Sequence, residues 1–115
     1  PPLSDRPRAP GMHASHYAPR KPFRVMERTL IRESISRMRG AGRKVVVITF
    51  LSRVDDLPDN VAFHVMPGNP DDYAREMYAV MRALDNGDFD FIVADAPPDA
   101  LPWQAVRDRL YRAAG

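Results

Sequence analysis

The chain has 115 residues and a net charge of +2; 44% of the residues are apolar and 28% charged, which predicts one folded domain with a modest core. The absence of cysteine excludes disulfide scaffolds, zinc–thiolate sites and cysteine nucleophiles. No apolar run approaches the roughly 20 residues of a membrane span, and no signal-peptide pattern is visible, so we expect a cytoplasmic protein without membrane contact. Because the chain begins with Pro1, we expect it to be a piece of a longer protein.

The charge is divided unevenly along the chain. Residues 1–44 carry eleven Lys or Arg and three acids, whereas residues 45–115 carry six Arg and twelve acids. The basic part can attract phosphate-bearing partners such as a nucleotide or RNA. A basic linker followed by a solvated helix face explains the same pattern. Composition leaves both interpretations open.

Proline marks the first boundary. Six of the twelve prolines fall within residues 1–22, which show neither helical nor strand periodicity. Each proline removes a backbone donor and fixes its own backbone, so this stretch cannot pack as a regular element. We therefore predict an extended, proline-rich interdomain linker over residues 1–22 and a folded domain over residues 23–115.

From residue 23 onward, strand and helix patterns alternate. Strands are predicted at residues 23–25, 44–50, 61–66 and 89–94 because these runs are apolar and mostly β-branched or aromatic. Helical stripes are formed by three sets: Met26, Leu30, Ile31, Ile35 and Met38; Tyr73, Met77, Val80, Met81 and Leu84; and Trp103, Val106, Leu110 and Tyr111. Glycines at 40 and 42 end the first helix, and Asn69 with Pro70 begins the second.

This order of elements predicts an α/β domain with a mostly parallel sheet and flanking helices. Only ten residues, 51–60, join the second and third predicted strands, which is short for a parallel crossover. The pairing of those two strands therefore stays open.

The sequence lacks a phosphate cradle. Residues 51–58, which follow the strand at 44–50, contain no glycine, and neither a dinucleotide-binding nor a P-loop pattern occurs. We expect no catalytic residue and no conventional nucleotide site within residues 23–115.

The histidines do not form a metal site by their pattern. His13 and His16 are three residues apart, but they lie among prolines with one acid nearby. His64 is expected on a strand face. Asp95 follows the last strand, where open α/β sheets present ligand-facing groups, although a turn-capping role beside Pro97 explains it more simply.

Residues 9–22 combine an adaptable backbone with imidazole, phenol and cationic side chains. Arg20 and Lys21 could contact phosphates while His16 or Tyr17 lies against a base. A plain tether has the same composition.

The same linker carries a resemblance to a known family. Residues 10–19, Pro-Gly-Met-x-x-x-His-Tyr-Ala-Pro, resemble the linker motif of the long form of threonylcarbamoyl-AMP synthase. Residues 72–85 are similar to the family's tyrosine-rich helix, and residues 96–98 and 103–110 are similar to its end. The likeness spans residues 10–113.

The resemblance implies a Rossmann-like C-terminal domain without chemistry of its own, joined to an N-terminal YrdC-type catalytic domain. In that family ATP (with Mg), threonine and bicarbonate give threonylcarbamoyl-AMP and pyrophosphate, a nucleotidyltransferase reaction. The product supplies the threonylcarbamoyl group for an adenosine of certain tRNAs, so the process is tRNA modification. An autonomous module whose basic N-terminal part docks RNA or a protein is the alternative, and direct tRNA binding stays open.

The resemblance also implies roles for linker residues. The linker would fold over the active site of the catalytic domain, with His16 and Tyr17 binding ATP or the adenylate and Arg20 and Lys21 as phosphate contacts. The alternative for Tyr17 is an anchor to the C-terminal domain. Residues 13–15 depart from the family, since many relatives have basic and aromatic residues there.

Overall fold

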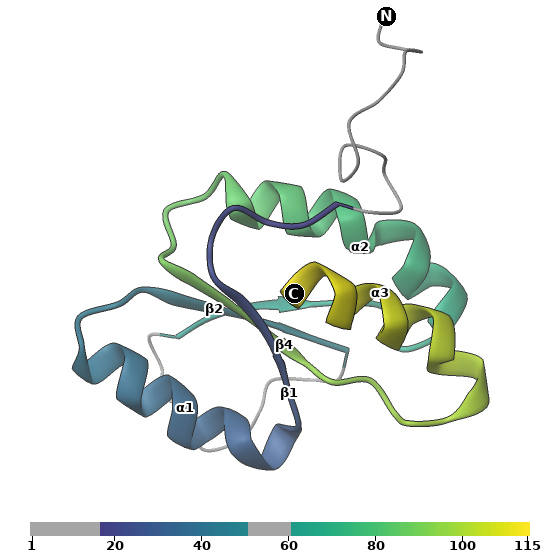
Figure 1. Cartoon of the computed structure of the whole chain (residues 1–115), viewed down its shortest axis with the longest axis horizontal. Coiled ribbons are helices and arrows are strands. Elements are labelled where there is room, and N and C mark those ends of the chain that lie inside the picture. The colour runs from purple at the N-terminus through teal and green to yellow at the C-terminus, as the bar shows by residue number, and fades with distance from the viewer. Residues whose placement is uncertain (1–16, 51–60) are drawn as a thin grey trace, which may run out of the picture.

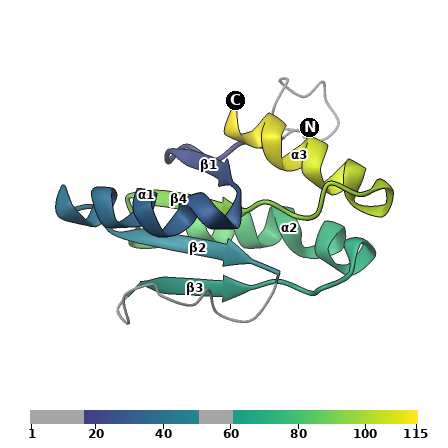
Figure 2. The same ribbon diagram turned by 90° about the horizontal axis from the view of Figure 1, so that it is seen from below.

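The computed structural model describes residues 17–50 and 61–115. In chain order its elements are β1 (Phe23–Met26), α1 (Arg28–Gly40), β2 (Val45–Thr49), β3 (Ala62–Val65), α2 (Pro70–Asp85), β4 (Phe91–Asp95), the single-turn helix η3 (Leu101–Trp103) and α3 (Gln104–Ala114). The strands form one sheet in the order β1-β4-β2-β3, and every pairing is parallel. The four arrows in Figure 2 accordingly point the same way. The predicted α/β class with a parallel sheet is confirmed.

The pairing that the sequence left open is parallel as well. β2 lies beside β3 with Val46 opposite Ala62 and Thr49 opposite Val65. The connecting residues 51–60 lie outside the described part of the chain.

The helices cover both faces of the sheet and create two cores. α1 packs on one face, where Ile31 and Ile35 meet Val47 and Val93. α2 and α3 lie on the other face (Figure 1). The larger core there contains thirteen buried residues: Phe23, Val46, Ile48, Met66, Tyr73, Met77, Met81, Ile92, Ala94, Trp103, Val106, Leu110 and Ala113.

Three residues of the predicted helical stripes are placed differently. Met26 belongs to β1, where it pairs with Asp95 of β4. Leu30 is 55% exposed, because Ile31 and Ile35 already fill the face that α1 turns toward the sheet. Tyr111 is 41% exposed on α3.

The predicted helix boundaries have the expected local causes. The Asn69 side chain accepts a hydrogen bond from the Asp72 backbone N–H at 2.9 Å, and Pro70 is the first residue of α2. Gly42, just after α1, has φ +81°, a conformation that favours glycine. Local capping signals therefore fix where both helices begin or end.

Candidate functional site

The last linker residues lie against the C-terminal end of α2. In Figure 1 this purple segment runs beside α2 before it turns into β1. The Tyr17 hydroxyl donates to Asp85 Oδ2 at 2.8 Å, and the Arg20 backbone N–H donates to the same oxygen at 3.0 Å. The Lys21 backbone N–H donates to Asp85 Oδ1 at 3.0 Å. We call these four residues the linker clasp.

The Lys21 side chain closes the end of helix α2. Its Nζ lies 2.5 Å from the carbonyl oxygen of Asp85, 2.6 Å from that of Gly87 and 3.5 Å from that of Leu84. The last carbonyls of a helix have no partner within the helix and carry the negative end of its dipole. The Lys21 ammonium therefore caps α2 and is fully engaged inside the domain.

Tyr17 and Arg20 are held by further contacts at the same helix end. The Arg82 guanidinium lies 5.7 Å from the centre of the Tyr17 ring, which also packs against the larger core. Arg20 donates from its guanidinium to Asn86 Oδ1 at 2.9 Å, while Arg20 Nε lies 3.5 Å from Asp85 Oδ2. The Arg20 side chain is still 79% exposed, so one of its faces remains open to solvent.

The contacts of the clasp set the ionisation of Tyr17 and Asp85. Burial and the hydrogen bond to Asp85 raise the pKa of Tyr17 to about 12, so its hydroxyl keeps its proton at neutral pH. Burial alone would raise the pKa of Asp85, but the backbone N–H groups of Arg20 and Lys21 and the Tyr17 hydroxyl together lower it below its usual range. The protonated Tyr17 hydroxyl therefore donates to an ionised Asp85 carboxylate.

A second buried carboxylate lies at the carboxyl end of the sheet. Asp95, whose side chain is 1% exposed, accepts a hydrogen bond from Thr49 Oγ1 at 3.0 Å. An Arg28 guanidinium nitrogen lies 2.6 Å from the same Asp95 oxygen and 3.1 Å from Thr49 Oγ1. Burial raises the pKa of Asp95, against the lowering effect of Thr49 and Arg28. Asp95 therefore ties β4 to β2 and α1 instead of capping the turn before Pro97.

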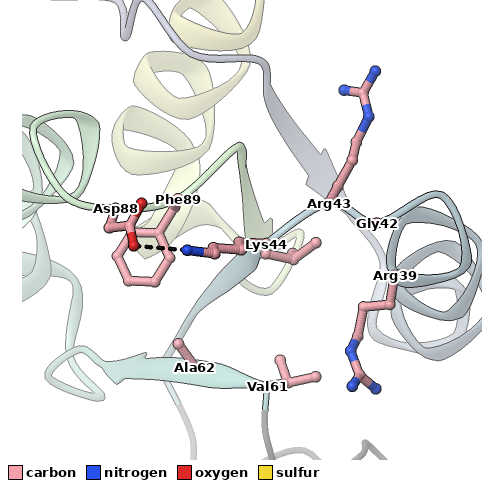
Figure 3. A pocket seen from close by; sticks show the side chains of 9 residues that line it. Arg39, Gly42, Arg43, Lys44, Val61, Ala62, Asp88 and Phe89 are labelled. Carbon is pink, nitrogen blue, oxygen red and sulfur yellow. Dashed lines mark hydrogen bonds and ion pairs between the residues drawn. The ribbon is translucent and has the colours of Figure 1, made fainter.

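A pocket of about 380 Å³ opens at the amino ends of the strands. Figure 3 shows Lys44 reaching across it to Asp88, with 2.8 Å between Nζ and the carboxylate, and this contact raises the pKa of Lys44. In the same view Arg43 points away from Lys44, and Arg39 extends toward Val61. The three cations do not converge on one point, so the pocket is not an anion cradle.

The structure brings three of the four linker candidates together. Tyr17, Arg20 and Lys21 all contact α2, whereas His16 and His13 lie outside the described residues. His64 lies half-buried on β3, a strand residue as expected. Residues 17–50 and 61–115 contain no group of three His, Asp or Glu side chains placed to hold a metal ion. Within these ranges no helix is long and apolar enough to cross a membrane.

Asp85 is the functional candidate that sequence reasoning missed. The helical periodicity of the sequence could have found it, because Asp85 continues the buried stripe of Tyr73, Met77 and Met81 at a spacing of four residues. An acid on the apolar face of a helix needs donors from another part of the chain. Here those donors come from the linker.

Comparison with known proteins identifies relatives over nearly the whole chain. The model of the family "Threonylcarbamoyl-AMP synthase, C-terminal domain" matches residues 2–115. The threonylcarbamoyl-AMP synthase of Bacillus subtilis (strain 168) is 30% identical to this chain in an alignment 115 positions long, which covers 97% of this chain and 33% of that protein. The chain thus spans about a third of the length of this curated relative.

Two solved structures share the fold. Pyrococcus abyssi Sua5 complexed with L-threonine matches 86% of this chain and 29% of its own length, with a TM-score of 0.71 and 28% identity. The C-terminal Sua5 domain of Pyrococcus horikoshii matches 82% of this chain and 93% of its own length, with a TM-score of 0.64 and 22% identity. The family match and these structures agree with the likeness seen in the linker and helices: the chain belongs to the family of threonylcarbamoyl-AMP synthase C-terminal domains.

Proposed function

We propose that this chain is the linker-bearing C-terminal part of a longer enzyme that makes threonylcarbamoyl-AMP and pyrophosphate from ATP, threonine and bicarbonate. The family match over residues 2–115 carries this proposal. The P. abyssi relative was solved with L-threonine, which supports threonine as the amino-acid substrate. The product would supply the threonylcarbamoyl group for an adenosine of certain tRNAs.

We assign the chemistry to an N-terminal YrdC-type catalytic domain of the same protein. The relatives support this division, since B. subtilis threonylcarbamoyl-AMP synthase extends well beyond the third that this chain covers. Three cations of the described residues also support it, because each has a partner inside the domain: Lys21 caps α2, Arg28 pairs with Asp95, and Lys44 pairs with Asp88. Because these three cations are engaged and the described residues hold no group of three metal-ligating side chains, we place ATP with Mg in the catalytic domain.

We propose that the linker crosses from this domain to the catalytic domain and covers the reacting molecules. The contacts of Tyr17 with Asp85 and Arg82 favour the anchoring role for Tyr17. His16, the next residue toward the catalytic domain, is then the ring that we assign to ATP or the adenylate. The exposed guanidinium of Arg20 fits a phosphate contact, whereas the Lys21 ammonium fits its helix-capping role.

The proposed activity is tested on the full-length protein. Pyrophosphate release and formation of threonylcarbamoyl-AMP are measured with all three substrates and with threonine or bicarbonate left out. We expect product only when all three are present, and background release from the 115-residue chain alone. A full-length protein without threonine-dependent release would overturn the proposal. In the coding frame upstream of Pro1, a start codon in place of a YrdC-type domain would favour the autonomous binding module.

The linker assignment is tested with His16→Ala in the full-length protein. We expect synthesis to fall at least about tenfold, the scale of one lost hydrogen bond in the transition state. His64→Ala is the matched control, because it removes the same side chain from β3 at a distance from the linker clasp. Equal rates for the two variants would remove His16 from the site.

A further inference from the structure

The negative charge of the Asp85 carboxylate lies in an environment that disfavours it. Its side chain is 3% exposed, and it is the last residue of α2, where the helix dipole is negative. A buried charge at such a position requires several donors. Every donor that the described residues give to its carboxylate comes from the linker, from Tyr17, Arg20 and Lys21.

The end of α2 does not require this carboxylate. The backbone N–H groups of Asn86 and Gly87 already donate to the carbonyls of Arg82 and Leu84, and the Lys21 ammonium occupies further carbonyls. An apolar residue at position 85 would extend the stripe of α2 without burying a charge. The carboxylate therefore serves the linker rather than the helix.

The geometry of the clasp accepts the linker in one register. Two adjacent backbone N–H groups, of Arg20 and Lys21, go to the two oxygens of one carboxylate, and a hydroxyl three residues upstream returns to one of them. A shift of the linker by one residue would remove the Tyr17 hydroxyl from Asp85. The clasp thus fixes the position of Tyr17, the residue to which residues 1–16 are joined.

We propose that Asp85 is a positioning residue for threonylcarbamoyl-AMP synthesis. It holds the linker at Tyr17 and so fixes the place and direction from which the linker reaches the catalytic domain; this inference rests on the proposed function. Asp85 acts through Tyr17 and touches no substrate. Without it, residues 17–21 lose their fixed conformation, and each productive arrangement has to order them again.

The test compares Asp85→Asn with Asp88→Asn in the full-length protein. Asp88 undergoes the same chemical change three residues further on, but its side chain is 91% exposed and pairs with Lys44 instead of the linker. For each variant kcat and KM for ATP and threonine are measured, together with hydrogen exchange of the Arg20 and Lys21 amides. Amides of β2 and β4 report on the fold itself.

We expect Asp85→Asn to lower kcat/KM at least tenfold. The Arg20 and Lys21 amides should exchange at least tenfold faster, while the β2 and β4 amides keep their protection. Asp88→Asn should stay within twofold of the parent in both measurements. Combining Asp85→Asn with Tyr17→Phe should cost less than the product of the two single losses, because both changes break the same contact.

Two results would overturn the positioning role. The first is an Asp85→Asn variant in which the Arg20 and Lys21 amides exchange faster but kcat/KM stays within twofold of the parent. The second is an Asp85→Asn variant in which these two amides keep their protection. If Asp85→Asn also loses amide protection in β2 and β4, Tyr17→Phe becomes the deciding variant. We expect Tyr17→Phe to lower kcat/KM about threefold, and an unchanged kcat/KM would refute the positioning role. A parent without synthesis overturns the proposed function and the positioning role with it, while the Arg20 and Lys21 amides still show whether Asp85 holds the linker.

Discussion

Two buried aspartates end two elements of this domain, and their pKa values shift in opposite directions. The pKa of Asp85, at the end of α2, is lowered, whereas that of Asp95, at the end of β4, is raised. Both lie almost entirely out of solvent. Asp85 accepts two backbone N–H bonds and a phenol hydroxyl, but Asp95 has a threonine hydroxyl and one half-exposed arginine. Burial raises the pKa of both carboxyls; at Asp85 the donors together outweigh it, whereas at Asp95 burial outweighs the donors.

The two carboxylates also connect different parts of the molecule. Asp95 joins β4 to β2 and α1, all inside the domain. Asp85 joins the domain to the linker over 64 to 68 residues of sequence. Asp95 thus holds together elements of the sheet and α1, whereas Asp85 holds Tyr17, Arg20 and Lys21 in the segment that precedes β1.

The largest expected effect is on the stability of Asp85→Asn. An amide keeps one acceptor oxygen but turns a donor toward the linker N–H groups, so we expect a loss of about 3 kcal/mol in the free energy of unfolding. Urea denaturation of the 115-residue chain near pH 7 measures it. Asp88→Asn should leave the midpoint unchanged. A loss below about 1 kcal/mol would mean that the linker donors are replaced by water.

Removing the linker should reverse the sign of the stability change that a substitution at position 85 causes. In a chain that starts at Pro22, Asp85 keeps its charge but loses Tyr17, Arg20 and Lys21. Asp85→Leu should then raise the free energy of unfolding by about 1 to 2 kcal/mol, because it deletes an unsatisfied buried charge. In the complete chain the same substitution should destabilise. If Asp85→Leu changed the free energy of unfolding in the same direction in the shortened and the complete chain, the linker could not be the partner of Asp85.

Arg28→Gln should have a smaller effect. The Arg28 side chain is 36% exposed, so water screens its pair with Asp95, and Thr49 remains as a donor. We expect a loss of about 1 kcal/mol in the same denaturation experiment. A loss as large as that of Asp85→Asn would show that the Arg28 pair, and not the number of donors, dominates this end of the sheet.

The pH dependence of stability should separate the two carboxylates by sign. Asp85, with its lowered pKa, contributes stability that is present above the ordinary aspartate pKa and lost as pH falls through its folded value. Asp95, with its raised pKa, contributes stability that is present below the ordinary value and lost as pH rises through its folded value. Between pH 3 and 7, Asp85→Asn should therefore flatten the acid loss of the parent, whereas Asp95→Asn should gain stability relative to the parent as pH rises. Parallel curves for both variants would contradict the opposite shifts.

The predictable parts of the structure depend on local signals. Asn69 with Pro70, Gly42 and the β-branched run Val45–Thr49 each specify an element from a few neighbouring residues, and all were predicted. The α/β class followed from the order of these elements. Strand order did not follow, because the ten residues 51–60 between the second and third predicted strands are short for a parallel crossover and left the pairing of these strands open.

The site was predictable only from the linker side. Tyr17, Arg20 and Lys21 stood out by chemistry and by likeness to the family, and anchoring was an open alternative for Tyr17. Asp85 was overlooked since Leu84 completed the apolar stripe equally well. The contact between residues 17 and 85 is long-range, and periodicity in α2 gives the buried face but not its partner.

The clasp also determines which part of the domain bears mechanical load. The linker runs directly into β1, an edge strand of four residues held to the sheet by β4 alone. A pull on the linker toward its N-terminus meets the Tyr17–Asp85 contact before it reaches the hydrogen bond between Pro22 and Ile92. Tension on the linker is therefore passed first to α2, a helix of 16 residues whose buried apolar side chains pack in the larger core, before it reaches the edge strand β1.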